Sequence, residues 1–105
     1  MRFYLKNRSG SVDAVAKYDE EKKTFTVLKG SRVSEHVSNA PTFRSIKSIV
    51  ALRNEYIVDR VIVKKDVSFK SPSSAANFVR GISTDGRLAW KDENGRTFKE
   101  IFGGK

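Results

Sequence analysis

The sequence of 105 residues contains no cysteine, and this absence excludes several kinds of chemistry. Disulfide bonds, zinc sites built on thiolates and cysteine nucleophiles all require that side chain. A chain without cysteine suits a reducing compartment, and we expect the protein to be cytoplasmic. Long apolar runs are missing as well, since no stretch approaches the roughly 20 residues that cross a bilayer. The N-terminal segment MRFYLKNRSGS also lacks the pattern of a signal peptide, so we expect no membrane partner.

Histidine is nearly absent: His36 is the single one, and it lies in a stretch without periodicity. A Ser–His catalytic pair would depend on that residue alone. The carboxylates are not clustered at the spacing of metal ligands, and Leu28–Ser31 lacks the upstream glycine of a phosphate-binding loop. We therefore expect a protein that is not an enzyme and that holds no cofactor or metal. An undetected nuclease would have to rely on residues such as Asp85 or Glu100.

Positive charge is abundant, with 21 lysines and arginines against 12 acidic residues and a net charge of +9. Such a balance favours polyanionic partners, nucleic acid above all, although a generically basic solvated surface has the same composition. We expect DNA rather than RNA. The basic residues are scattered along the chain, so any binding patch must be assembled by the fold.

The first 30 residues have the alternation of a β-meander. Arg2–Lys6, Val12–Tyr18 and Thr24–Lys29 each place apolar residues at period two, with turn residues between them. Gly30 follows the third strand, where we expect a positive φ or a tight bend.

Two helices are predicted after a loop at Ser31–Thr42. The first should run over about 42–57 with Thr42 as its N-cap, because apolar residues recur there at three- and four-residue spacings. Asp59–Asp66 is ambiguous between a short strand and an exposed loop. The second helix should run over 72–80, because Ser71 suits an N-cap, Pro72 suits the first helical position and Gly81 suits the residue after the end.

The C-terminal part, 86–102, should hold a strand at Arg87–Lys91 with Leu88 and Trp90 alternating, and a tight turn at Glu93–Gly95. Arg96–Phe102 suits either a returning strand or a short helix capped by Thr97. We therefore expect one small α+β domain over 1–105. Its antiparallel sheet would combine the meander of 2–30 with a C-terminal strand or hairpin and pack against two helices.

Several segments together resemble a bacterial and phage family, domain of unknown function family 4357. The resemblance rests on FKSPSSAANFVRG (Phe69–Gly81), DGRLAWK (Asp85–Lys91) and NGRTFKEI (Asn94–Ile101). Upstream, AVAKY (Ala14–Tyr18) and FTVLKGS (Phe25–Ser31) are similar to the family's opening motifs. The similarity extends over about Val12 to Ile101.

This resemblance implies a domain that is usually C-terminal to GIY-YIG nucleases and DNA methyltransferases. The C-terminal half also resembles the restriction-enzyme and adenine-methylase-associated (RAMA) domain, which is proposed to read DNA or a modified base. In the family motif N-G-W-x-x-W, Arg87 replaces the first tryptophan and Trp90 keeps the second. A charge therefore replaces a stacking side chain at that position.

We expect a non-catalytic DNA-binding module associated with DNA modification or restriction, able to sense modified DNA. A phosphate would lie at the start of the 72–80 helix, where unpaired N–H groups and hydroxyls suit an anion. The serines there can equally cap the helix or contact solvent. Trp90 can equally lie in the core. The predicted nucleic-acid-binding residues are Lys29, Ser31, Lys70, Ser71, Ser73, Ser74, Arg80, Arg87, Trp90 and Lys91. The alternative is a protein-interaction module that docks a nuclease, a methyltransferase or another acidic partner.

Overall fold

A four-stranded antiparallel sheet forms the centre of the computed structural model, which describes residues 1–38 and 46–103. The strand order is β1 (Arg2–Lys6), β2 (Asp13–Asp19), β3 (Thr24–Val27) and β6 (Val67–Phe69). A separate hairpin pairs β4 (Ile57–Val58) with β5 (Ile62–Val63). The helices are α1 (Ile46–Tyr56), α2 (Pro72–Arg80), α3 (Gly86–Ala89) and α4 (Phe98–Phe102). The predicted α+β class with an antiparallel sheet is confirmed.

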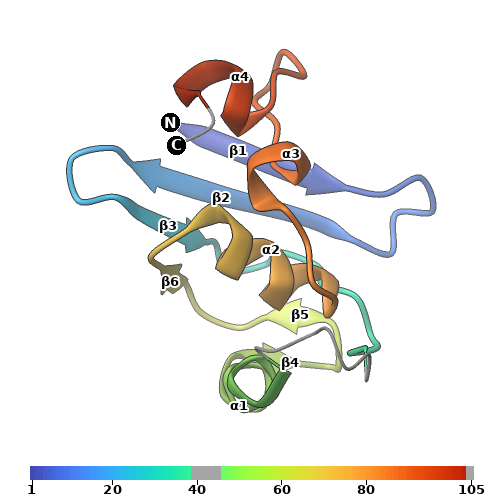
Figure 1. The fold of residues 1–105 in the computed structure, drawn as a ribbon. Helices are drawn as coiled ribbons and strands as arrows, with labels where there is room; N and C mark the ends of the chain where they lie inside the picture. The colour runs from blue at the N-terminus through green and yellow to red at the C-terminus, as the bar shows by residue number, and fades with distance from the viewer. Residues whose placement is uncertain (39–45, 104–105) are drawn as a thin grey trace.

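One face of the sheet is apolar because the strands alternate. Phe3, Ala14, Ala16, Phe25 and Val27 are all fully buried on that face. Helix α2 contributes its own buried stripe to the same core, made of Ala75, Ala76, Phe78 and Val79. Figure 1 shows α2 and α3 together on one side of the sheet. Adjacent alanines let the α2 backbone approach the strands closely. Helix α2 covers only this face, and the opposite face of the sheet carries the exposed and half-buried side chains.

Helix α2 has the bounds and both caps that its sequence predicts. The Ser71 hydroxyl accepts the backbone N–H of Ser74 at 3.1 Å. At the other end Gly81 has φ 69° and donates its N–H to the Asn77 carbonyl at 2.8 Å. Pro72 occupies the first helical position, where the missing N–H costs no hydrogen bond.

The other N-terminal predictions are confirmed where the structure describes them. The three meander strands form, and Gly30 has φ 90°. The expected helix start, with Thr42 as cap, lies outside the described residues, and α1 is described from Ile46. The ambiguous segment after α1 is the turn and second strand of the β4–β5 hairpin, with Asp59 and Arg60 both at positive φ.

The expected C-terminal strand at Arg87–Lys91 is wrong. This segment begins as the short helix α3 because the Asp85 carboxylate accepts the Arg87 N–H at 3.1 Å and so caps a helical turn. Leu88 is 51% exposed while Trp90 is fully buried, so the two side chains do not share a face. The fourth strand of the sheet is instead β6, which pairs with β3.

The last segment, Arg96–Phe102, contains the short helix α4 and not a returning strand. Thr97 caps it by accepting the Glu100 N–H at 3.1 Å, and the Glu100 carboxylate accepts the Thr97 N–H at 3.1 Å in return. The hydrogen bond from the Thr97 N–H to its carboxylate lowers the pKa of Glu100. Phe98 and Phe102 of α4 complete an aromatic cluster with Phe3, at ring-centroid distances of 5.5 and 6.4 Å.

Arg53 of α1 holds α1, the loop after β3 and the end of α2 together. It is 8% exposed, although arginine is almost never fully buried. Its guanidinium donates to the carbonyls of Phe78, Val79 and Ser34 at 2.9, 3.1 and 2.7 Å and to the Ser34 hydroxyl at 3.0 Å. Burial lowers the pKa of Arg53 to about 10. The carbonyls at the α2 C-terminus carry partial negative charge, which stabilises the cation there.

We predict that Arg53→Lys lowers the free energy of unfolding by about 1–3 kcal/mol, because one ammonium group cannot reach carbonyls on three sides and leaves buried acceptors unpaired. Urea denaturation measures the difference. Arg80→Lys is the matched control, since Arg80 is an exposed arginine on the adjacent helix and should change stability by less than about 0.5 kcal/mol. Equal stabilities of the Arg53 variant and the original protein would contradict this role.

Candidate nucleic-acid interface

The start of α2, where we expected a phosphate, is occupied by hydrogen bonds within the protein. The Ser71 hydroxyl accepts the Ser74 N–H and donates to the Ser74 hydroxyl at 3.0 Å. The Ser73 hydroxyl accepts the N–H of Gly86 at 2.9 Å. All three serines therefore serve the folded structure, and Ser74 is the exposed one among them.

Helix α3 covers this end of α2. The indole Nε1 of Trp90 donates to the Pro72 carbonyl at 3.0 Å. Gly86 lies so close that a Cβ atom there would overlap the Pro72 carbonyl and the Ser73 nitrogen. The helix start is thus a packing contact between α2 and α3, and the geometry leaves no room for a phosphate on the side that faces α3.

Two predicted binding residues are buried for structural reasons. Trp90 is fully buried, with its ring centroid 4.9 Å from that of Phe25, so it is not available to stack on a base. Ser31 is 4% exposed, and its hydroxyl bonds the N–H and the carbonyl of Val15 at 3.0 and 3.3 Å. Both predictions of a binding role are corrected by this placement.

The predicted cations are not brought together. Arg87 forms an ion pair with Asp85 at 3.2 Å, and that hydrogen bond raises the pKa of Arg87 and lowers that of Asp85. Lys91 pairs with the outer edge of β1, whereas Lys70 follows β6 at the other edge, about four strand spacings or roughly 19 Å away. The remaining two are exposed at other places: Arg80 at the end of α2 and Lys29 after β3.

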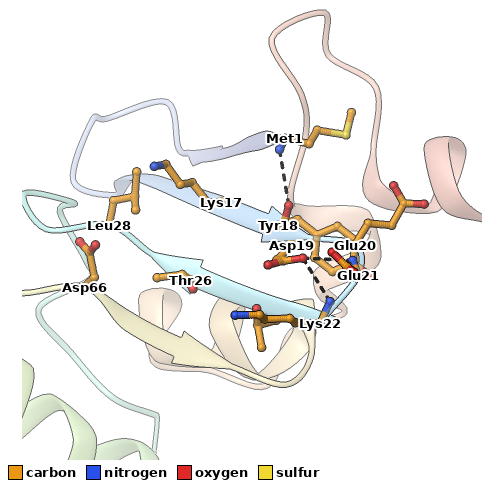
Figure 2. A pocket seen from close by; sticks show the side chains of 11 residues that line it. Met1, Lys17, Tyr18, Asp19, Glu20, Glu21, Lys22, Thr26, Leu28 and Asp66 are labelled. Carbon is orange, nitrogen blue, oxygen red and sulfur yellow. Dashed lines mark hydrogen bonds between the residues drawn. The ribbon is translucent and has the colours of Figure 1, made fainter.

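The structure instead creates a different candidate surface, the face of the sheet that α2 does not cover. We call it the open face. Figure 2 looks onto it, with the strands in front and α2 behind. Its side chains alternate with those of the core and are exposed or half-buried: Arg2, Tyr4, Lys6, Asp13, Val15, Lys17, Thr26, Leu28 and Ser68.

A single row of the open face crosses all four strands. Arg2 lies opposite Lys17, Lys17 lies opposite Thr26, and Thr26 lies opposite Ser68. The hydroxyls of Thr26 and Ser68 are 2.8 Å apart and share a hydrogen bond. In the part of the chain that the structure describes, no carboxylate comes within ion-pair distance of Arg2 or Lys17. We call these four residues the central row.

A trough of about 640 Å³ includes Lys17 and Thr26 of the central row and extends to the β2–β3 turn (Figure 2). Asp19 lies at its edge and accepts the N–H groups of Glu21 and Lys22, each at 3.1 Å, so its carboxylate shapes the turn. The charges that line the trough are mixed: Lys17, Lys22, Asp19, Glu20, Glu21 and Asp66. This acidic turn limits the basic part of the open face on one side.

Tyr4 is a candidate binding residue that sequence reasoning missed. It lies on the open face beside a groove of about 480 Å³ between β1 and the segment after α3. The signal was present, because Phe3 and Leu5 are inward in the β1 alternation and the residue between them must point outward.

Within residues 1–38 and 46–103, no group of three or more histidine and acidic side chains is arranged to hold a metal ion. The helices described there include none that is long and apolar enough to cross a membrane.

Comparison with known proteins identifies a family. The family described as "Domain of unknown function (DUF4357)" matches residues 3–102, so the chain belongs to it. No curated protein and no solved structure matches the chain. The family assignment agrees with the motifs in the sequence and extends over nearly every element of the fold.

We predict that Lys17→Thr raises the free energy of unfolding by about 0.2–1 kcal/mol, because like charges directly opposite each other in a sheet are destabilising. Lys6→Thr is the matched control: Lys6 lies opposite Asp13 on the same strand pair, so its loss should lower stability by a similar amount. Thermal unfolding at low salt measures both changes, and high salt should shrink them. A loss of stability in Lys17→Thr would contradict repulsion within the central row.

Proposed function

We propose that this protein is a non-catalytic nucleic-acid-binding module that uses the open face of its sheet. The observation that carries the proposal is the central row, in which Arg2 and Lys17 lie opposite each other and neither forms an ion pair with a carboxylate among the described residues. Two facing cations cost stability in the free protein, and a bound polyanion relieves that cost. The net charge of +9 supports the same class of partner.

The chemistry of the row suits the sugar–phosphate backbone. Arginine, lysine and hydroxyl side chains are the usual partners of phosphate oxygens, and such contacts orient a nucleic acid without reading its sequence. Thr26 and Ser68 add hydroxyls in line with the two cations. We therefore propose backbone binding as the main source of affinity.

The family resemblance supports DNA over RNA and a role beside DNA-modifying or restriction enzymes in the cytoplasm. The motif that resembles the RAMA domain lies in α3 and the turn after it, and Trp90 of that motif is part of the core. Sensing of a modified base would therefore have to use other side chains. We place the proposed interface on the strands for this reason.

The direct test is a salt titration of DNA affinity measured by fluorescence anisotropy. Lys17→Ala should flatten the slope of log K against log[salt] by about 0.9 for duplex DNA, or about 0.7 for a single strand, because one phosphate contact is lost. Lys99→Ala is the matched control, since this exposed lysine lies on α4 away from the open face. Equal slopes for the Lys17 and Lys99 variants would contradict an interface at the central row.

A second candidate function, docking of a nuclease or methyltransferase, is favoured by the outer side of α1. Val50 is 39% exposed and lines an apolar hollow with Ile46 and Ala51. A docking module would bind such a partner tightly in high salt, and Val50→Lys would abolish that association without changing DNA affinity.

A further inference from the structure

We infer that the open face binds a single-stranded nucleic acid and that one base stacks on Tyr4. This inference deepens the proposed function and rests on it. It names the kind of nucleic acid and the side chain that contacts a base, which phosphate contacts alone do not specify.

The first observation is that Tyr4 has no aromatic partner among residues 1–38 and 46–103. Every other aromatic residue in the described part of the chain contacts a ring or a cation, as Tyr18 contacts Phe98 at 5.0 Å and Tyr56 contacts the Lys65 ammonium at 4.8 Å. The ring of Tyr4 takes part in no such pair, and its hydroxyl has no hydrogen bond among the described residues. A half-buried ring on the edge strand β1 of the open face is thus available for a ligand.

The second observation is that the backbone of Tyr4 is held on both sides. Its N–H donates to the Lys91 carbonyl at 2.7 Å and its carbonyl accepts the Lys91 N–H at 3.0 Å. On the other side Tyr4 is paired with Val15 of β2. The ring is therefore presented from a rigid strand, and little conformational entropy is lost when a base stacks on it.

The groove beside Tyr4 has the charges that such a base site needs. Its lining residues include Lys6, Lys91, Asp92 and Glu93, and the two lysines can contact the flanking phosphates. Asp92 is 7% exposed and is held by the Arg96 guanidinium at 3.0 Å and by the N–H groups of Asn94 and Arg96. Burial opposes ionisation of Asp92, but these hydrogen bonds outweigh it and lower its pKa. Because Arg96 compensates the charge of Asp92, this carboxylate does not cancel the positive charge of the two lysines.

The position of Tyr4 relative to the central row suits a single-stranded nucleic acid that binds both features at once. Tyr4 is two residues along β1 from Arg2, which corresponds to about 6.6 Å on the same face. A base stacked on Tyr4 therefore brings the phosphates beside it within reach of Arg2 and Lys17. The two features form one continuous surface.

A duplex fits this surface poorly. Its bases are stacked on one another, so Tyr4 could reach a base only after unpairing, which costs a few kcal/mol. Reading a duplex through its major groove requires a helix or a β-ribbon that enters it, and α2 lies behind the sheet (Figure 2). A single strand can lie along a sheet with its bases on aromatic side chains, as in other sheet-based binding domains.

The experiment compares a fluorescein-labelled twelve-residue oligothymidylate, a duplex of equal length and inorganic polyphosphate as competitor. We expect the single strand to bind at least about fivefold more tightly than the duplex. Tyr4→Leu should weaken single-strand binding by about 5- to 150-fold, the range for loss of one stacked base, and Tyr4→Phe should retain it. Tyr56→Leu, the same substitution away from the open face, should have no effect, and circular dichroism checks that each variant is folded.

Failure of this inference differs from failure of the proposed function. Equal affinity for both oligonucleotides, with Tyr4→Leu unchanged and Lys17→Ala weakened, would overturn base stacking and leave backbone binding intact. If inorganic polyphosphate displaced the labelled oligonucleotide as well as unlabelled oligonucleotide of equal charge does, base stacking would also be overturned. Absence of binding to either oligonucleotide at low salt would overturn both.

Discussion

The packing of α2 against one face of the sheet is the contact on which the other features depend. Ala75 and Ala76 are both fully buried, and their small size brings the helix backbone down onto the strands. Once α2 lies there, α3 covers its start through Gly86 and Trp90, and Arg53 holds its end. The same contact leaves the other face of the sheet without a covering layer.

Because α2 covers only one face, the two faces of the sheet have different physical roles. The covered face provides stability through apolar burial, and its aromatic side chains contact one another. The open face carries two cations that lie opposite each other and a tyrosine that contacts no other ring among the described residues. Residues that do not contribute to folding often belong to functional sites. On this ground we propose the open face as a ligand interface.

Local signals in the sequence predicted the parts of the fold that local interactions form. The meander follows from period-two alternation, and α2 follows from a cap, a proline and a glycine that act within a few residues. The segment of α3 was misread because Leu88 and Trp90 mimic an alternating strand, whereas Asp85 caps a turn of helix. The strand β6 was not predicted because three residues carry too little pattern to identify a partner such as β3.

The same difference between local and tertiary interactions applies to the candidate site. By itself, the sequence determined the family, the class of fold, the excess of positive charge and the outward direction of Tyr4, because these depend on composition, motifs or neighbours along one strand. Only the tertiary structure decided which charges face each other and which hydroxyls are already bonded. Arg2 and Lys17 are 15 positions apart, and Gly86 reaches Ser73 across 13, so both pairs arise from packing between elements. For that reason the serines at the start of α2 are bonded within the protein, and we propose the open face as the interface instead.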